Sequence, residues 1–161
     1  RVRSLAIDCA VTSTRIVDPK LDGIRLHDEH YAFVGQPRLL SSLPLRGEKD
    51  AKAHTFFDTT EELPLSRYLR EAPGGLDSLA FSRVVRLGTI AAIRQQVLRG
   101  RGVAVLPAYF VEADLRAGRL ARILPRVRPL SDFFRLVFRI DDPRRDYLTR
   151  LSACLRSRPL R

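Results

Sequence analysis

The chain has no methionine and few cysteines. It begins at Arg1, and we therefore expect it to be part of a longer polypeptide. Its two cysteines, Cys9 and Cys154, belong to no CxxC pair, which argues against a zinc site and against a dithiol redox site. Because both lie in apolar or amphipathic segments, we expect them to be buried free thiols.

Long apolar runs are also missing. No stretch approaches the roughly 20 apolar residues that a membrane-spanning helix needs. The N-terminus lacks the basic start, apolar core and small-residue cleavage site of a secretory signal. We therefore expect a cytoplasmic protein with no membrane partner. The apolar share of 45% is ordinary for a globular core, and 161 residues correspond to one domain.

Enzyme motifs are absent as well. No serine lies in a GxSxG elbow, and Gly100-Arg101-Gly102 precedes a predicted strand, whereas a phosphate loop precedes a helix. The adjacent Glu61 and Glu62 have no partner that suggests an acid/base pair. The cluster 27–30 would place its two histidines on opposite faces of a strand. We therefore expect no catalytic residues, no metal, no cofactor and no enzymatic activity.

Lysine is scarce, because 26 of the 29 basic residues are arginine. The charge is also uneven: residues 1–80 have a net charge of −1, and residues 81–161, with 18 arginines and 6 acidic residues, have a net charge of +12. A basic half suggests a nucleic-acid partner. The arginines are nevertheless spread over several predicted elements without interleaved aromatics, which favours a solvated arginine surface.

The most informative stretch is residues 87–125. Apolar residues recur at helical spacing over 90–98 and predict an amphipathic helix. The continuous apolar run 103–106 is typical of a strand covered on both faces. Pro107 suits the first position of a second helix, which Gly118 ends.

The rest of the chain also alternates strands and helices. The pattern predicts strands over 5–11, 31–35, 55–58, 81–87 and 133–140, a helix over 64–72, loop over 15–28, and a connection over 37–52 that contains a short helix. A last helix is capped by Asp142, has Pro143 in its first turn, and buries Tyr147, Leu148, Leu151 and Leu155. This alternation predicts an α/β fold with a mainly parallel sheet.

Residues 100–125 resemble the pattern aGlGiallP…l…G.Lv.lLp of LysR-type transcriptional regulators, where it lies in the effector-binding domain. Residues 5–14 and 26–37 resemble two strands of that domain, and residues 133–155 resemble its closing strand and last helix. The resemblance therefore covers almost the whole chain, in the order of the family.

The resemblance implies a type 2 periplasmic-binding-protein-like fold with two α/β subdomains, of which the first is incomplete here. Residues 1–36 and 136–161 would be the remnant of subdomain I, and residues 37–135 would form subdomain II. The crossing strands would lie near 34–37 and 135–138. The family's N-terminal winged helix-turn-helix and the front of the effector domain are absent from this chain.

The same resemblance places an effector cleft between the subdomains, near strand ends and helix starts. The backbone N–H groups of Gly88 and Thr89 are the best candidates for an anion contact. The other candidates are Arg86 for a carboxylate, the hydroxyls of Thr12 and Ser13, Leu87 as a further effector-binding residue, and Pro107 and Tyr109 along the wall. Alternatively, Thr89 is only an N-cap, Arg86 only a solvated charge, and Thr12 and Ser13 only turn residues.

Three functions fit these observations. The first is the sensor domain of a regulator that binds a small metabolite, with an anion favoured, forms a dimer or tetramer, and contacts DNA through its missing N-terminal domain. The second is the solute-binding protein of a transporter with the same fold. The third is a basic nucleic-acid-binding module.

Overall fold

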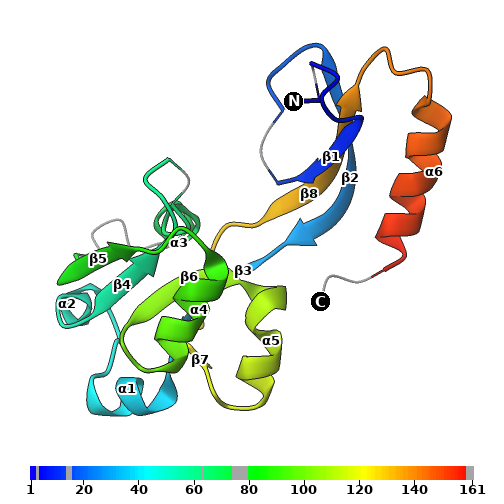
Figure 1. The fold of residues 1–161 in the computed structure, drawn as a ribbon. Helices are drawn as coiled ribbons and strands as arrows, with labels where there is room; N and C mark the ends of the chain where they lie inside the picture. Colours follow the sequence, from blue (N-terminus) through cyan, green and yellow to red (C-terminus); the bar gives the residue numbers. More distant parts are fainter. Residues whose placement is uncertain (3, 14–15, 63, 74–79, 159–161) are drawn as a thin grey trace. The chain divides into compact units, whose positions relative to one another are not determined.

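The computed structural model describes residues 1–2, 4–13, 16–62, 64–73 and 80–158. The chain divides into two compact units (Figure 1): unit 1 is Arg1–Glu29 with Asp132–Arg161, and unit 2 is His30–Ser131. The chain therefore passes between the units at residues 29/30 and 131/132. The predicted boundaries lay at 36/37 and 135/136, and the residues of β3, predicted to belong with the first subdomain, lie in unit 2.

Unit 1 is a three-stranded antiparallel sheet with one helix. The strand order is β1 (Cys9–Thr12), β8 (Asp132–Arg139), β2 (Leu21–Glu29). Helix α6 (Arg145–Arg156) packs on one face through Leu148, against Leu26, Leu136 and Phe138. Since side chains alternate along β8, Leu136 and Phe138 point to the helix, and Arg135 and Val137 point to the other face.

Unit 2 has a mixed five-stranded sheet. Its order is β5 (Arg83–Arg86), β4 (Thr55–Asp58), β6 (Val103–Pro107), β3 (Tyr31–Gly35), β7 (Ala121–Arg122). Strand β4 is parallel to β5 and β6, whereas β3 is antiparallel to β6 and β7. The helices are α1 (Pro37–Ser42), α2 (Glu48–Ala51), α3 (Arg67–Arg70), α4 (Ile90–Leu98) and α5 (Ala108–Arg116).

Both faces of this sheet are covered. Helices α4 and α5 pack on one face through Ile93, Val97 and Val111, and α1 and α3 contribute to the cluster on the other face. Strand β3 serves both clusters, because Phe33 points to one and Val34 to the other. This explains why all five residues of β3 are buried.

The predicted α/β class and the helix–strand–helix unit are confirmed, but the sheets are less parallel than expected. Of the pairings in the described residues, two are parallel and four are antiparallel. The reason lies in where β3 begins: Tyr31 is opposite Pro107, at the end of β6, so β3 must run against β6.

Other predictions need correction. Residues 21–28, predicted as loop, belong to β2, whose apolar face carries Ile24 and Leu26 while its other face is polar. The first strand is shorter than predicted, and the helix predicted over 64–72 spans only α3. On α6, Tyr147 and Cys154 were predicted to be buried but are exposed. Each directly precedes a leucine of the helix face that packs on the sheet, and consecutive helical residues point about 100° apart.

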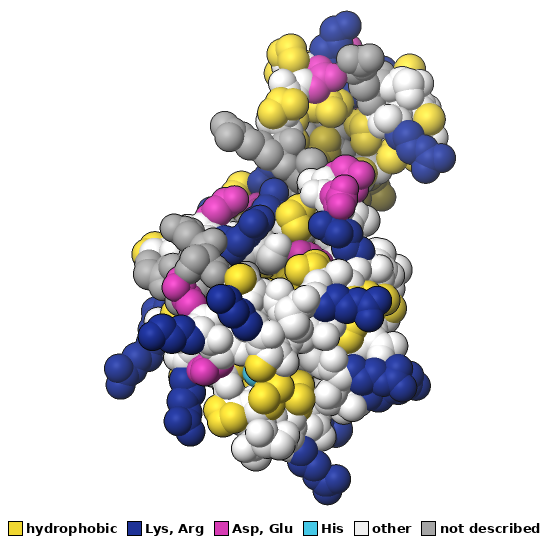
Figure 2. Space-filling view, turned by 90° about the vertical axis from the view of Figure 1, so that its left-hand side faces the viewer, with side chains coloured by type: hydrophobic (Ala, Val, Ile, Leu, Met, Phe, Trp, Pro, Cys, Tyr) yellow, Lys and Arg dark blue, Asp and Glu magenta, His cyan; other side chains and the backbone are white. Residues whose placement is uncertain are grey.

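On the face shown in Figure 2, the Lys and Arg side chains are dispersed and do not gather in one patch. Ion pairs neutralise several arginines in the described part of the chain, for example Arg116 with Glu112 at 2.9 Å on α5.

Candidate functional site

Three parallel strands of unit 2 end at one edge of the sheet. Because β4 is parallel to both β5 and β6, their carboxyl ends meet there, at Asp58, Arg86 and Pro107. Helices α4 and α5 start from the same edge, directly after β5 and β6. In open α/β sheets, ligands bind outside the carboxyl ends of the strands. This edge is therefore the candidate site.

Asp58, the last residue of β4, binds the chain segment that follows this strand. Its side chain is buried, with a relative exposure of 2%. Its Oδ1 accepts hydrogen bonds from the backbone N–H groups of Thr59 (2.9 Å) and Leu65 (2.7 Å), and its Oδ2 accepts one from Ser66 (3.4 Å). These bonds satisfy the buried carboxylate and hold the chain that follows β4. The sequence offered no signal for this role, since the donors lie up to eight residues away.

Arg86 reaches across this edge to Glu61. Its Nη1 lies 3.2 Å from Glu61 Oε1, and both side chains are substantially exposed, at 48% and 73%. Exposed pairs of this kind contribute little free energy, on the order of 0–1 kcal/mol. Arg86 can therefore exchange Glu61 for another carboxylate at small cost.

A cavity of about 320 Å³ lies beside this pair, and all of its lining belongs to unit 2. Its polar lining consists of Asp58, Glu61, Ser66, Arg70 and Arg86. Its apolar lining consists of Phe56, Pro64, Leu69, Phe81 and Val84. A few polar groups set in an apolar wall are typical of small-molecule sites.

The predicted N–H contacts at Gly88 need correction. The Leu87 N–H donates to Asp58 O (3.0 Å), and the Gly88 N–H donates to Thr59 O (3.2 Å). Both groups therefore extend the β4–β5 pairing, and neither is available to an anion. Gly88 adopts φ +71°, a conformation that favours glycine.

Thr89 is the N-cap of α4. Its backbone is extended, and its Oγ1 accepts a hydrogen bond from the Ala92 N–H at 3.2 Å. This is the capping role that the sequence left open beside ligand binding. Of the six candidates in unit 2, only Arg86 lines the cavity.

The remaining candidates fall into two groups. Pro107 is buried and precedes α5, in whose first turn Tyr109 is half-buried. Thr12 and Ser13 belong to unit 1, where Thr12 ends β1 opposite Arg135 on β8. The structure thus brings Arg86, Gly88, Thr89 and Pro107 to one sheet edge, and it places Thr12 and Ser13 in the other unit.

No three His, Cys, Asp or Glu side chains in the described ranges are grouped so that they could hold a metal ion. No helix in the part of the chain that the structure describes is long and apolar enough to span a membrane.

Comparisons with known proteins agree on a single family. The family model described as "LysR substrate binding domain" matches residues 1–159. Among solved structures, the regulatory domain of CrgA, a LysR-type regulator from Neisseria meningitidis, superposes with a TM-score of 0.75 at 18% identity, covering 97% of this chain and 77% of that one. The C-terminal domains of a LysR family protein from Agrobacterium tumefaciens give 0.78 at 18%, covering 97% and 74%.

Full-length regulators are much longer than this chain. LysG from Corynebacterium glutamicum, solved with its effector Arg bound, gives a TM-score of 0.71 at 19% identity, and the match covers 97% of this chain but 52% of LysG. At these identities the likeness shows the fold. No curated protein matches the chain.

Proposed function

The chain belongs to the LysR substrate-binding domain family, and from this premise we propose that it senses a small metabolite for a DNA-binding transcription regulator. It is an effector-binding domain by family, and the identity and position of its effector are part of the proposal. The proposed regulator is a cytoplasmic homo-oligomer that contacts DNA through a separate N-terminal domain.

The observation that carries the ligand site is the cavity at the carboxyl edge of β4 and β5. It has the size and the mixed lining of a small-molecule site, and it includes the predicted Arg86. We propose it as the contribution of unit 2 to the effector cleft that the resemblance implies. Thr12 and Ser13 remain the proposed contribution of unit 1. The Thr89 N–H remains a proposed anion contact, Leu87 a proposed effector-binding residue, and Pro107 and Tyr109 proposed wall residues.

The cavity has two arginines and two carboxylates, and an acidic effector would bind at the arginines. Arg70 and Arg86 offer guanidinium groups that can bind a carboxylate through paired hydrogen bonds. The cost is low for Arg86, because its present partner Glu61 is exposed. The apolar wall around Phe56, Leu69 and Phe81 would cover the body of the ligand.

A thermal-shift screen tests this function. The protein is heated with a panel of small organic acids, each paired with its neutral alcohol or amide. A true effector at 100 times its Kd should stabilise the fold by about 2.7 kcal/mol. The gain should be lost in Arg86→Gln and kept in Arg83→Gln, since Arg83 is an exposed arginine of the same strand that does not line the cavity.

Two results together would reject the proposal. One is a panel in which no acid raises the melting temperature. The other is a full-length version of the protein that does not bind the DNA upstream of its own gene.

A further inference from the structure

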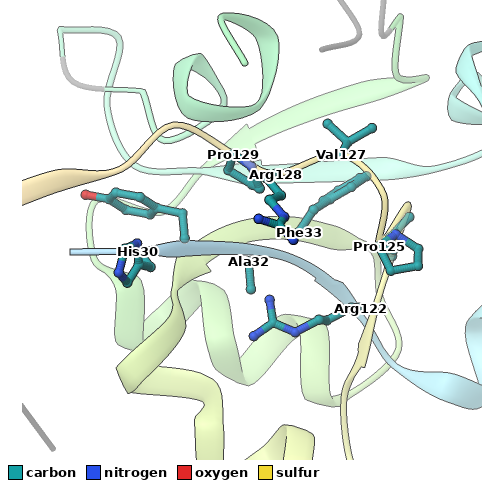
Figure 3. Close-up of a pocket in the computed structure, with 10 residues that line it drawn as sticks. His30, Ala32, Phe33, Arg122, Pro125, Val127, Arg128 and Pro129 are labelled. Carbon is teal, nitrogen blue, oxygen red and sulfur yellow. The ribbon is translucent and has the colours of Figure 1, made fainter. Parts of the chain in front are cut away.

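A second cavity lies on the β3–β7 side of the unit 2 sheet, the side away from β5 (Figure 3). It measures about 330 Å³ and is bordered by the start of β3, by Arg122 of β7 and by the segment from Pro125 to Pro129. Strand β7 has only two residues and pairs with Val34 and Gly35. The Ile123 N–H after β7 donates to Phe33 O (2.9 Å), and the cavity lies along the part of the β3 edge beyond this bond, around His30–Ala32.

The charged side chains of this cavity are of one sign. Arg122 and Arg128 line it, and no carboxylate among the residues that the structure describes does so. Within the described ranges, no Asp or Glu lies at ion-pair distance from either guanidinium, whereas four other arginines of unit 2 each have such a partner: Arg86, Arg94, Arg116 and Arg119. The positive charge in the cavity is therefore not compensated locally, in contrast to the cavity at Arg86.

The two guanidinium groups approach the strand from different faces. Arg122 is opposite Val34 in the β3–β7 pair and so shares the face of Val34 and Ala32. Figure 3 shows its side chain extending toward Ala32, and it shows Arg128 on the other side of the β3 ribbon, between Pro129 and Phe33. Ile123 and Val127 belong to the core on the Phe33 face and supply apolar wall.

We propose that this cavity binds a small organic anion, an acid with an apolar body, at a site separate from the effector cavity. A carboxylate would form charge-assisted hydrogen bonds with Arg122 and Arg128, and its body would lie against the apolar wall. A neighbouring cavity of about 470 Å³ shares Arg122, Ile123 and Pro125 and adds Arg46. This neighbouring cavity therefore adds a third cation close to Arg122.

The lining argues against a nucleic acid as the occupant. Single strands bind by stacking bases on exposed aromatic rings. The aromatic residues here, Tyr31 and Phe33, are 6% and 3% exposed and pack in the core. The cavity is concave and of small-molecule size.

Isothermal titration calorimetry with cyclohexanecarboxylate tests the site, with cyclohexylmethanol as the neutral analogue. Binding of the acid should weaken about tenfold or more in the double variant Arg122→Gln/Arg128→Gln, as expected for the loss of charged hydrogen bonds. Arg126→Gln is the matched control, because it removes one exposed arginine from the same segment without altering the lining. Melting curves of all variants check that each one folds.

A third variant, Arg86→Gln, distinguishes this cavity from the effector cavity. It should leave binding of the acid to the cavity at Arg122 and Arg128 unchanged. The proposal is wrong if the alcohol binds as tightly as the acid, or if Arg126→Gln weakens binding as much as the double variant. It is also wrong if no heat of binding is detected with the folded protein, or if only Arg86→Gln abolishes binding. Should the double variant fail to fold, perturbation of the Ala32 and Phe33 amide resonances by the acid, without perturbation at Arg86, decides the question.

Discussion

At the scale of single residues, Gly102 has the tightest surroundings among the unit 2 glycines that the structure describes. A Cβ built there would lie 2.3 Å from Thr55 O and 2.8 Å from Phe57 Cε2, so β4 passes directly against this position. Gly102→Ala must push β4 and β6 apart and should lower the free energy of unfolding by about 1–3 kcal/mol.

Gly47→Ala is the matched control for this substitution. Nothing lies within 4 Å of its Cβ position, and its φ of −174° is extended backbone that alanine adopts. Urea denaturation of both variants measures the difference. Equal stability losses would mean that the approach of β4 to Gly102 is not tight.

Asp114 is a fully buried carboxylate that joins three segments. Its Oδ2 accepts a hydrogen bond from Arg94 Nε of α4 (2.6 Å), and its Oδ1 accepts one from Arg119 Nε after α5 (2.8 Å). Burial alone would raise the pKa of Asp114, but the hydrogen bonds from Arg94 and Arg119 outweigh burial and lower the pKa. Asp114→Ala should cost about 2–3 kcal/mol, less than a fully buried pair, because the two arginines stay partly hydrated.

The lowered pKa of Asp114 also predicts a pH dependence. Its stabilising contribution is complete above the unfolded pKa, whose ordinary value is 3.8, and is lost as the pH falls through the lower folded pKa. Below about pH 4 the wild type should therefore lose stability more steeply than Asp114→Asn. Glu112→Gln, which removes an exposed pair on the same helix, should change stability by less than about 0.5 kcal/mol at any pH. Parallel acid titration curves of wild type and Asp114→Asn would contradict this assignment.

At the scale of elements, helix α4 depends on its N-cap. The Oγ1 of Thr89 satisfies the Ala92 N–H, which has no partner within the helix. Thr89→Ala should therefore lower the free energy of unfolding by about 1 kcal/mol. Thr89→Ser keeps the hydroxyl and should have a free energy of unfolding close to that of the wild type. Thermal denaturation monitored by circular dichroism measures both. A serine variant as unstable as the alanine variant would show that capping is not what Thr89 contributes.

Elements with local signals could be predicted from the sequence. Helix α4 begins at a capping threonine and ends before Gly100 at φ +69°, and α5 ends before Gly118 at φ +67°. Strand β2 could not be predicted, because Gly23 and the polar face suggested loop, and only pairing with β8 makes it a strand. Long-range pairing of this kind leaves little trace in local composition.

The candidate site was predictable only in part for the same reason. Arg86 could be placed at the end of a strand from its position in the pattern. The role of Asp58 depends on the chain segment at Leu65, which folds back and donates to its carboxylate. The Gly88 N–H is occupied because it donates to the carbonyl of Thr59, which follows β4. Neither partner can be read from spacing.

At the scale of the whole molecule, the two units have very different cores. Among its described residues, unit 1 has one cluster with four buried apolar residues, Leu26, Leu136, Phe138 and Leu148. Its Leu5, Val11, Val17 and Ile140 are all more than 50% exposed. Unit 2 has two clusters that cover both faces of its sheet. Since protection against local unfolding follows buried apolar contact, unit 1 should open at a lower free energy than unit 2.

Native-state hydrogen exchange at increasing guanidinium concentration measures this difference strand by strand. The informative comparison is β8, the central strand of unit 1, with β6, which is fully buried in unit 2. The amides of β8 should exchange through an opening of lower free energy, and those of β6 only through global unfolding. Because unfolding would then proceed in two steps, a single melting temperature would not describe the chain. If β8 and β6 instead share one opening free energy at every denaturant concentration, the two units form one cooperative structure, and the small core of unit 1 draws its stability from the rest of the molecule.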